Sequence, residues 1–166
     1  MCSVTRRLAA VCVLAVFTLG VASRSVPAQD RRNLKGIDSV FVVVETLPSG
    51  ASKLGLSEGI VQTDVEQKLR LAGLRVVTNQ EGENLPGSPY LDVRLIATDP
   101  PEAVAIEISL NENATLARNG DFAPEVETWE KVHVIANPSG QAVRDKIKDL
   151  ADEFLNDWLA VNPKKE

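Results

Sequence analysis

The residues best suited to acid–base chemistry are the chain's only histidine, His133, and two acidic residues upstream of it, Glu112 and Asp121. An imidazole exchanges protons near neutral pH, and two carboxylates can flank a substrate in hydrolysis. A hydrolase would need Glu112 or Asp121 beside His133 in a cleft, and the sequence does not fix these distances. We therefore predict that His133 is exposed on a sheet face within ETWEKVHVIA (127–136), and that Trp129 packs in the core or at its rim.

The sequence lacks the motifs of several common enzyme classes. No serine stands in a G-x-S-x-G elbow, and neither a P-loop nor a G-x-G-x-x-G fingerprint is present. A zinc site needs several histidine or cysteine ligands, and residues 29–166 offer only one, His133. We expect a protein without enzymatic activity, cofactor or bound metal.

The N-terminal 28 residues have the three parts of a secretory signal peptide. Arg6 and Arg7 precede an apolar run over residues 8–22, and Val26-Pro27-Ala28 provides a cleavage site. An uncleaved signal anchor is the alternative, but the run is shorter than the roughly 20 residues that span a bilayer. We predict cleavage after Ala28, a periplasmic or secreted location in a bacterium, and no transmembrane segment in the processed chain.

Removal of residues 1–28 changes the composition of the protein. Both cysteines, Cys2 and Cys12, would be lost, so packing alone must stabilise the processed chain. Residues 29–166 carry 15 basic and 23 acidic side chains, a net charge of −8. A surface of this charge repels phosphate backbones and anionic lipid, so we do not expect nucleic acid as a partner.

The processed chain is predicted to form a single domain over residues 37–163, between a loose leader (29–36) and a short tail (164–166). The apolar run Val40–Val44 is mostly β-branched and typical of a strand buried on both faces. Residues 57–72 predict a helix with Ser57 as N-cap and Gly73 at its left-handed end. The polar side chains of this helix, Asp64 among them, are predicted to lie away from its apolar stripe.

Four further strands are predicted over residues 74–78, 90–98, 103–118 and 125–136. Alternation places Asp92 and Arg94 on one face of the second of these strands, and Glu107 and Ser109 outward on the third. The third strand is long enough to bend, at residues 111–113. In the fourth, we predict a bulge near Glu130 and Lys131 that turns Trp129, Val132 and Val134 inward and leaves His133 outward.

A closing helix is predicted within residues 137–163, with Asn137 or Ser139 as its cap. Its charged residues are interpreted as a solvated face whose charges pair along the helix. The predicted order is β-α-β-β-β-β-α. This order favours an α+β fold, a two-layer sandwich of a mainly antiparallel sheet of about five strands with two helices on one face.

The sequence resembles an uncharacterised family of secreted bacterial proteins. The resemblance lies in VEQKLRLAGLRVV, YLDVRL, AIEISLNENATLARNG, ETWE and IKDLADEFLNDWLAVNP, and it covers most of residues 37–163. The topology is also similar to the lipopolysaccharide-assembly lipoprotein and to the N-terminal domain of the Tol-system propeller protein. By analogy, the resemblance implies an assembly or interaction role in the bacterial envelope.

Two functional hypotheses follow. The first is a non-enzymatic interaction or envelope-assembly module that binds a protein partner, an envelope or secreted protein, through the open sheet face or a strand edge. The second is a carrier of a small apolar ligand, held between the closing helix and the sheet. The candidate contact residues for a partner or a ligand are Trp129, His133, Arg94, Glu107, Phe154 and Trp158.

Overall fold

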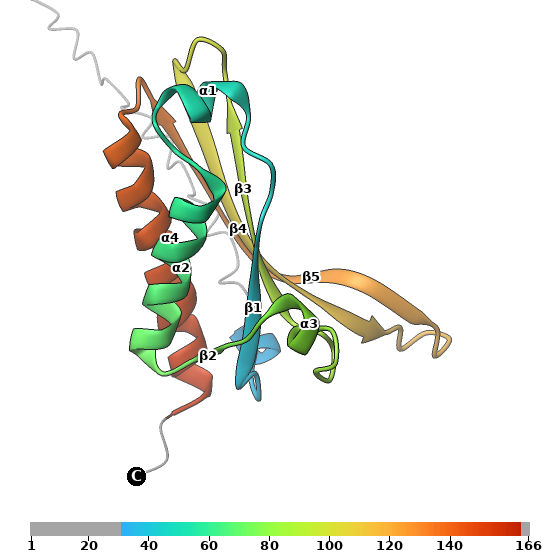
Figure 1. Ribbon diagram of the computed structural model, residues 1–166. Helices are drawn as coiled ribbons and strands as arrows, with labels where there is room; N and C mark the ends of the chain where they lie inside the picture. Colours follow the sequence, from blue (N-terminus) through green and yellow to red (C-terminus); the bar gives the residue numbers. More distant parts are fainter. Residues whose placement is uncertain (1–30, 164–166) are drawn as a thin grey trace, which may run out of the picture.

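The computed structural model describes residues 31–163, which form one mixed β-sheet with helices packed against it (Figure 1). The predicted signal peptide, its cleavage site and the predicted tail (164–166) lie outside the described residues. No helix within residues 31–163 has the length and apolar character needed to cross a membrane.

Five strands form the sheet in the order β2-β1-β3-β4-β5. β1 pairs in parallel with both β2 and β3, whereas β3, β4 and β5 form antiparallel pairs. The α+β class, the two layers and the five-stranded sheet are therefore as predicted. The strands are β1 (Ser39–Val44), β2 (Arg75–Val76), β3 (Tyr90–Ala97), β4 (Ala103–Thr115) and β5 (Phe122–Ala136).

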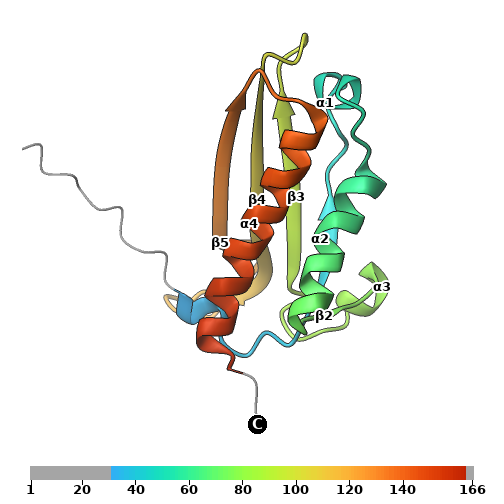
Figure 2. The same ribbon diagram turned by 90° about the vertical axis from the view of Figure 1, so that its left-hand side faces the viewer.

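Two long helices, α2 (Glu58–Ala72) and α4 (Gly140–Val161), cover the same face of the sheet (Figure 2). α4 contacts β4 and β5, whereas α2 contacts β1 and α4. Two connections predicted as loops contain short helices, α1 (Ser49–Lys53) and α3 (Asn79–Gly82). A capping box between Thr78 and Glu81 starts α3.

The ends of the long helices follow from their sequences. The Ser57 hydroxyl accepts a hydrogen bond from the Ile60 N–H at the start of α2, and Gly73 ends that helix with a φ of 93°. Of the two caps proposed for α4, Ser139 is the one used, because its hydroxyl accepts from the Ala142 N–H.

The core lies between the two helices and the sheet face that they cover. Leu91, Val93 and Leu95 of β3 point into it, as the alternation predicted. They meet Val61, Val65 and Leu69 of α2 and Val143, Ile147 and Phe154 of α4. Burial of apolar area on this scale is the main source of stability in a fold without disulfides.

The segment predicted as a loose leader is ordered from Arg31 onward, so that prediction is wrong for its C-terminal part. Arg31–Leu34 forms a 3-10 helix, η1, whose Leu34 side chain is fully buried in the core. Asn162 holds the segment at the end of α4: its side-chain amide donates to the Leu34 carbonyl, and its side-chain oxygen accepts from the Gly36 N–H. The sequence pattern did not reveal the buried Leu34, because most of its neighbours in residues 29–36 are polar or charged.

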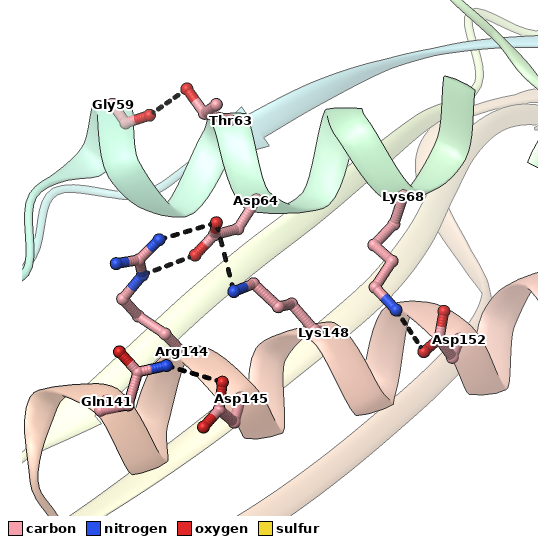
Figure 3. A network of polar contacts seen from close by, with 9 residues as sticks. All are labelled: Gly59, Thr63, Asp64, Lys68, Gln141, Arg144, Asp145, Lys148 and Asp152. Atoms are coloured by element: carbon pink, nitrogen blue, oxygen red, sulfur yellow. Dashed lines mark hydrogen bonds and ion pairs between the residues drawn. The ribbon is translucent and has the colours of Figure 1, made fainter. Parts of the chain in front are cut away.

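Ion pairs join α2 to α4 along the outer side of the helical layer (Figure 3). The Asp64 carboxylate accepts hydrogen bonds from Arg144 Nε and Nη2, at 2.7 and 2.9 Å, and lies 3.6 Å from Lys148 Nζ. Lys68 pairs with Asp152 at 2.6 Å. The predicted pairing along α4 is therefore wrong for Arg144 and Lys148, and Asp64 is buried between the helices rather than turned to solvent.

Candidate functional site

The sheet face opposite α2 and α4 is open over most of its area and is concave. β4 and β5 are the longest strands, and their distal ends bend away from the helical layer (Figure 1). The pairing register shifts twice in this region, between Leu110 and Asn111 and between Glu112 and Ala114. These bulges lie where a bend was predicted, and they curl the hairpin over the open face.

A concavity of about 390 Å³ lies on this face, between the sheet and the curled end of β5. Its charged lining consists of five carboxylates and one guanidinium. The lining residues are Val43, Glu45, Tyr90, Asp92, Arg94, Glu107, Ser109, Asn111, Glu125 and Glu127. Arg94, Glu107 and Ser109 thus lie together on the open face, as alternation along β3 and β4 predicted.

Arg94 is the only basic residue of this lining, and other side chains of the face already hold it. Its Nη2 donates to Glu45 Oε1 at 2.7 Å, and its Nη1 lies 3.4 Å from Glu107 Oε1. The hydrogen bond from Arg94 lowers the pKa of Glu45. Among the described residues, Arg94 thus forms ion pairs with Glu45 and Glu107, and no ion pair of Asp92, Glu125 or Glu127 is found.

Asp92 is the most buried of these carboxyl groups, at 9% relative exposure. Burial, with the nearby charge of Glu45 as the next cause, raises its pKa to about 6. Its aspartate form is consequently costly in the unliganded protein. A cation placed in the concavity would stabilise the ionised form of Asp92. The site therefore favours the binding of positively charged groups.

A second concentration of negative charge lies on the β4–β5 side of the face. Carboxylate oxygens of Glu107, Glu127 and Glu130 all lie within 4.8 Å of one another. The pKa of Glu127 is raised, first by burial and then by the charges of Glu130 and Glu107. Hard cations bind to carboxylate oxygens that lie this close together. The repulsion between the three carboxylates also favours the binding of any positively charged group next to them.

The structure exposes His133, as predicted, but on the other face of the sheet. It lies opposite Ile106 on the helix-facing side of the sheet, at its outer edge, where its side chain remains exposed. No bulge occurs at Glu130 and Lys131; the irregularity is at Thr128, which has no partner between the pairs Asn111–Glu127 and Leu110–Trp129.

The valines that flank His133 consequently point to the open face instead of the core. Val132 lies opposite Glu107 and Val134 opposite Ala105, and their relative exposures are 52% and 62%. The predicted inward orientation of both valines is therefore wrong, whereas that of Trp129 is confirmed.

Trp129, Phe154 and Trp158 are buried parts of the core rather than the lining of the open face. The rings of Trp129 and Phe154 meet edge-to-face with centroids 5.2 Å apart. The indole N–H of Trp129 donates to Asp157 at 3.1 Å, and that of Trp158 donates to the Ile37 carbonyl at 2.7 Å. Both indoles thus have packing and hydrogen-bonding roles within the fold.

Glu112 and Asp121 do not meet His133. The residue opposite Glu112 is Val126, seven positions along β5 from His133, which corresponds to roughly 20 Å in an extended strand. Asp121 precedes β5 at the far end of the hairpin. Neither carboxylate therefore lies beside His133.

Of the five carboxylates in the concavity, only Glu107 was predicted from the sequence as a candidate contact residue. The other four were not recognised as members of the same site. Asp92 was placed on the correct face by alternation, but its nearness to Glu45 depends on the parallel pairing of β1 with β3. Glu125 and Glu127 enter through the bulged part of β5, where alternation fails and Glu125 has a φ of 51°. The available signal was the position of Glu45, Glu125 and Glu127 at the ends of predicted strands.

No family model matches the chain, and no curated protein is significantly similar to it. Similar solved structures include a minor lipoprotein from Acinetobacter baumannii, with 14% identity over 76% of this chain and 95% of that one, at a TM-score of 0.38. The PelC dodecamer from Paraburkholderia phytofirmans has 13% identity over 75% and 89% of the two chains, at a TM-score of 0.44.

Lipoprotein GNA1162 from Neisseria meningitidis has 13% identity over 72% of this chain and 97% of that one, at a TM-score of 0.37. Two of these three proteins are bacterial lipoproteins by name. Likeness at this level assigns neither a partner nor an activity.

Proposed function

We propose that this protein is an exported, non-enzymatic interaction module whose open sheet face binds a cationic segment of a protein partner in the bacterial envelope. The observation that carries the proposal is the concave face with five carboxylates and a single arginine. The N-terminal pattern of residues 1–28 supports export, and the net charge of −8 after its removal supports a basic partner.

Charge complementarity at this face has a specific physical basis. Arg94 is already paired with Glu45 and Glu107, so the charges of Asp92, Glu125 and Glu127 remain to be neutralised by a partner. Lysine or arginine side chains entering the concavity would pair with carboxylates that are partly shielded from water. Pairs of this kind contribute more than fully exposed ones and steer association.

Two side chains of the concavity offer apolar surface to a polypeptide segment. Val43 and Tyr90 line the concavity beside the carboxylates, and the Tyr90 ring stacks on Phe41 with centroids 5.1 Å apart. The alkyl stems of lysine and arginine can lie along such groups while their charged ends reach the acids. A protein partner therefore fits better than a small inorganic cation.

The ligand-carrier hypothesis receives no comparable support. The aromatic side chains that would surround an apolar ligand pack against one another and against backbone groups, and each of them is buried in the core. A ligand between α4 and the sheet would have to displace these contacts. The open face needs no such rearrangement.

Binding of a lysine- and arginine-rich peptide, measured by fluorescence anisotropy, tests the proposal against a length-matched neutral peptide. The double variant Glu125→Gln/Glu127→Gln should bind about tenfold more weakly, since loss of two partly screened charge pairs corresponds to about 1.4 kcal/mol. Asp145→Asn/Asp149→Asn on α4 changes the net charge equally and should leave affinity unchanged. Equal losses in both double variants would show attraction by net charge alone and contradict a site on the open face.

A further inference from the structure

The two edges of the sheet are very different. β2, at one edge, has two residues, whereas β5, at the other edge, has 15. η1 covers one part of the outer side of β5, where the Asn33 side-chain amide donates to the Thr128 carbonyl at 3.3 Å. Beyond that contact, the segment from Lys131 to Ala136 forms the outer edge of the described sheet.

The backbone register shows which groups point outward along this segment. The Asn137 N–H donates to the Glu102 carbonyl at 2.6 Å, in line with the pairing of Ala136 with Ala103. Because hydrogen-bonded and non-hydrogen-bonded pairs alternate in an antiparallel ladder, odd-numbered residues here bond to β4. The N–H and C=O groups of Val132, Val134 and Ala136 therefore point away from the sheet, on the same side as the Thr128 carbonyl.

The side chains of this edge give it little protection against pairing. Natural sheets usually guard an edge with charges, proline or a covering segment. Val132 and Val134 are instead exposed and β-branched, and no charged residue occurs between Val132 and Ala136. The nearest charge, on Lys131, is directed to the helical side and lies 3.5 Å from Glu153.

We infer that two copies of this chain pair antiparallel through the outer edge of β5, about a two-fold axis at His133, and form one continuous ten-stranded sheet. In this register Val132 of each copy lies opposite Val134 of the other. Their outward N–H and C=O groups form four hydrogen bonds, and their four side chains form an apolar cluster between the two open faces. A self-complementary patch of this kind is what a two-fold interface requires.

The two neighbouring registers are less favourable than the one centred on His133. An axis at Val132 would bring Ala136 of the second copy onto Thr128, whose carbonyl is bonded to Asn33. An axis at Val134 would limit the paired stretch to residues 132–136, because β5 ends at Ala136. The axis at His133 pairs seven residues of each copy instead of five and leaves Thr128 outside the ladder. Because this axis is perpendicular to the sheet, it places the two acidic faces side by side.

Engineered cysteines test the register, because both native cysteines lie within residues 1–28 and are lost when the predicted signal is cleaved. The two His133 positions would form a non-hydrogen-bonded pair about 4.5 Å apart at Cα, within disulfide range. His133→Cys should therefore form covalent dimers on mild oxidation. Lys131→Cys should not, since its two copies would lie roughly 14 Å apart. Lys131→Cys/Ile135→Cys should restore cross-linking.

Light scattering of the processed protein, at micromolar concentration, provides the second test. The chain should have twice the mass of one copy, and Val132→Lys/Val134→Lys should be monomeric with an unchanged thermal midpoint, because both positions are exposed. Ile96→Lys, an equally exposed position on β3, should remain dimeric. A monomeric unmodified chain, or cross-linking of Lys131→Cys as fast as of His133→Cys, would overturn this pairing.

Discussion

Asp64 of α2 accepts two hydrogen bonds from the guanidinium of Arg144 on α4, at 2.7 and 2.9 Å, in a position where its side chain is nearly excluded from solvent. Asp64 thus links the two helices that form one layer of the fold. The hydrogen bonds from Arg144, followed by the charge of Lys148, lower the pKa of Asp64 against the opposing effect of burial.

Replacement of Asp64 by asparagine should lower the free energy of unfolding by about 2 kcal/mol, the usual scale for hydrogen bonds to a charged group. Because the folded pKa lies below the ordinary value of 3.8, this stabilisation is present above about pH 4 and is lost as the pH falls through the folded value. Urea denaturation of both proteins at pH 7 and pH 3 measures the difference. Asp152→Asn, which removes a more exposed pair, should cost less than about 1 kcal/mol.

Asp92 should show the opposite pH dependence. Its pKa is raised to about 6, so its ionised form destabilises the folded state as the pH rises from about 4 to above 6. Asp92→Asn should therefore stabilise the protein by about 1–2 kcal/mol at pH 7.5 and by much less at pH 4. The same variant should weaken binding of the cationic peptide. A loss of stability at pH 7.5 would contradict the assigned electrostatics of the concavity.

Trp129→Phe should destabilise the fold by about 2–3 kcal/mol, because it removes buried area and the hydrogen bond to Asp157. Differential scanning calorimetry measures the change. Phe122→Leu, at an exposed position of the same strand, serves as the control and should have little effect. An unchanged midpoint for Trp129→Phe would mean that the ring does not fill the core, which would revive the ligand-carrier hypothesis.

Gly82→Ala should disturb the docking of α3 on β1. A Cβ at this position would lie 2.1 Å from Cδ1 of Phe41, whose ring is held against Tyr90. Overpacking of this kind costs about 1–3 kcal/mol. Gly59→Ala on α2 meets nothing within 4 Å and should instead stabilise by a few tenths of a kcal/mol. Thermal unfolding of the two variants should therefore shift in opposite directions.

The parts of the fold that were predicted from sequence are those determined by local signals. α2 combines a serine cap, an apolar stripe and a terminal glycine within 17 residues, and all three act as expected. Alternation along β3 and β4 oriented Arg94 and Glu107 correctly, because both strands pair regularly in this region.

The parts that were missed depend on partners distant in sequence. The orientation of β5 is determined by its pairing with β4, and a single extra residue at Thr128 reverses every side chain beyond it. From the sequence, Asp64 was predicted to lie on a polar face of α2. Its contact with α4 depends on Arg144, which is 80 positions away in the sequence. The acidic concavity likewise exists only once β1, β3, β4 and the bulged β5 are assembled.

The most direct test of the central claim is site-specific photo-crosslinking in intact cells. A photoreactive phenylalanine derivative replaces Asn111, which lines the concavity, or Gln141, which lies at the start of α4 on the opposite side of the sheet. We predict that the probe at position 111 captures an envelope protein through a peptide rich in lysine and arginine, identified by mass spectrometry, and that the probe at 141 does not. Capture of the same segment from both positions, or of segments without basic residues at position 111, would contradict a binding site for a cationic partner on the open face.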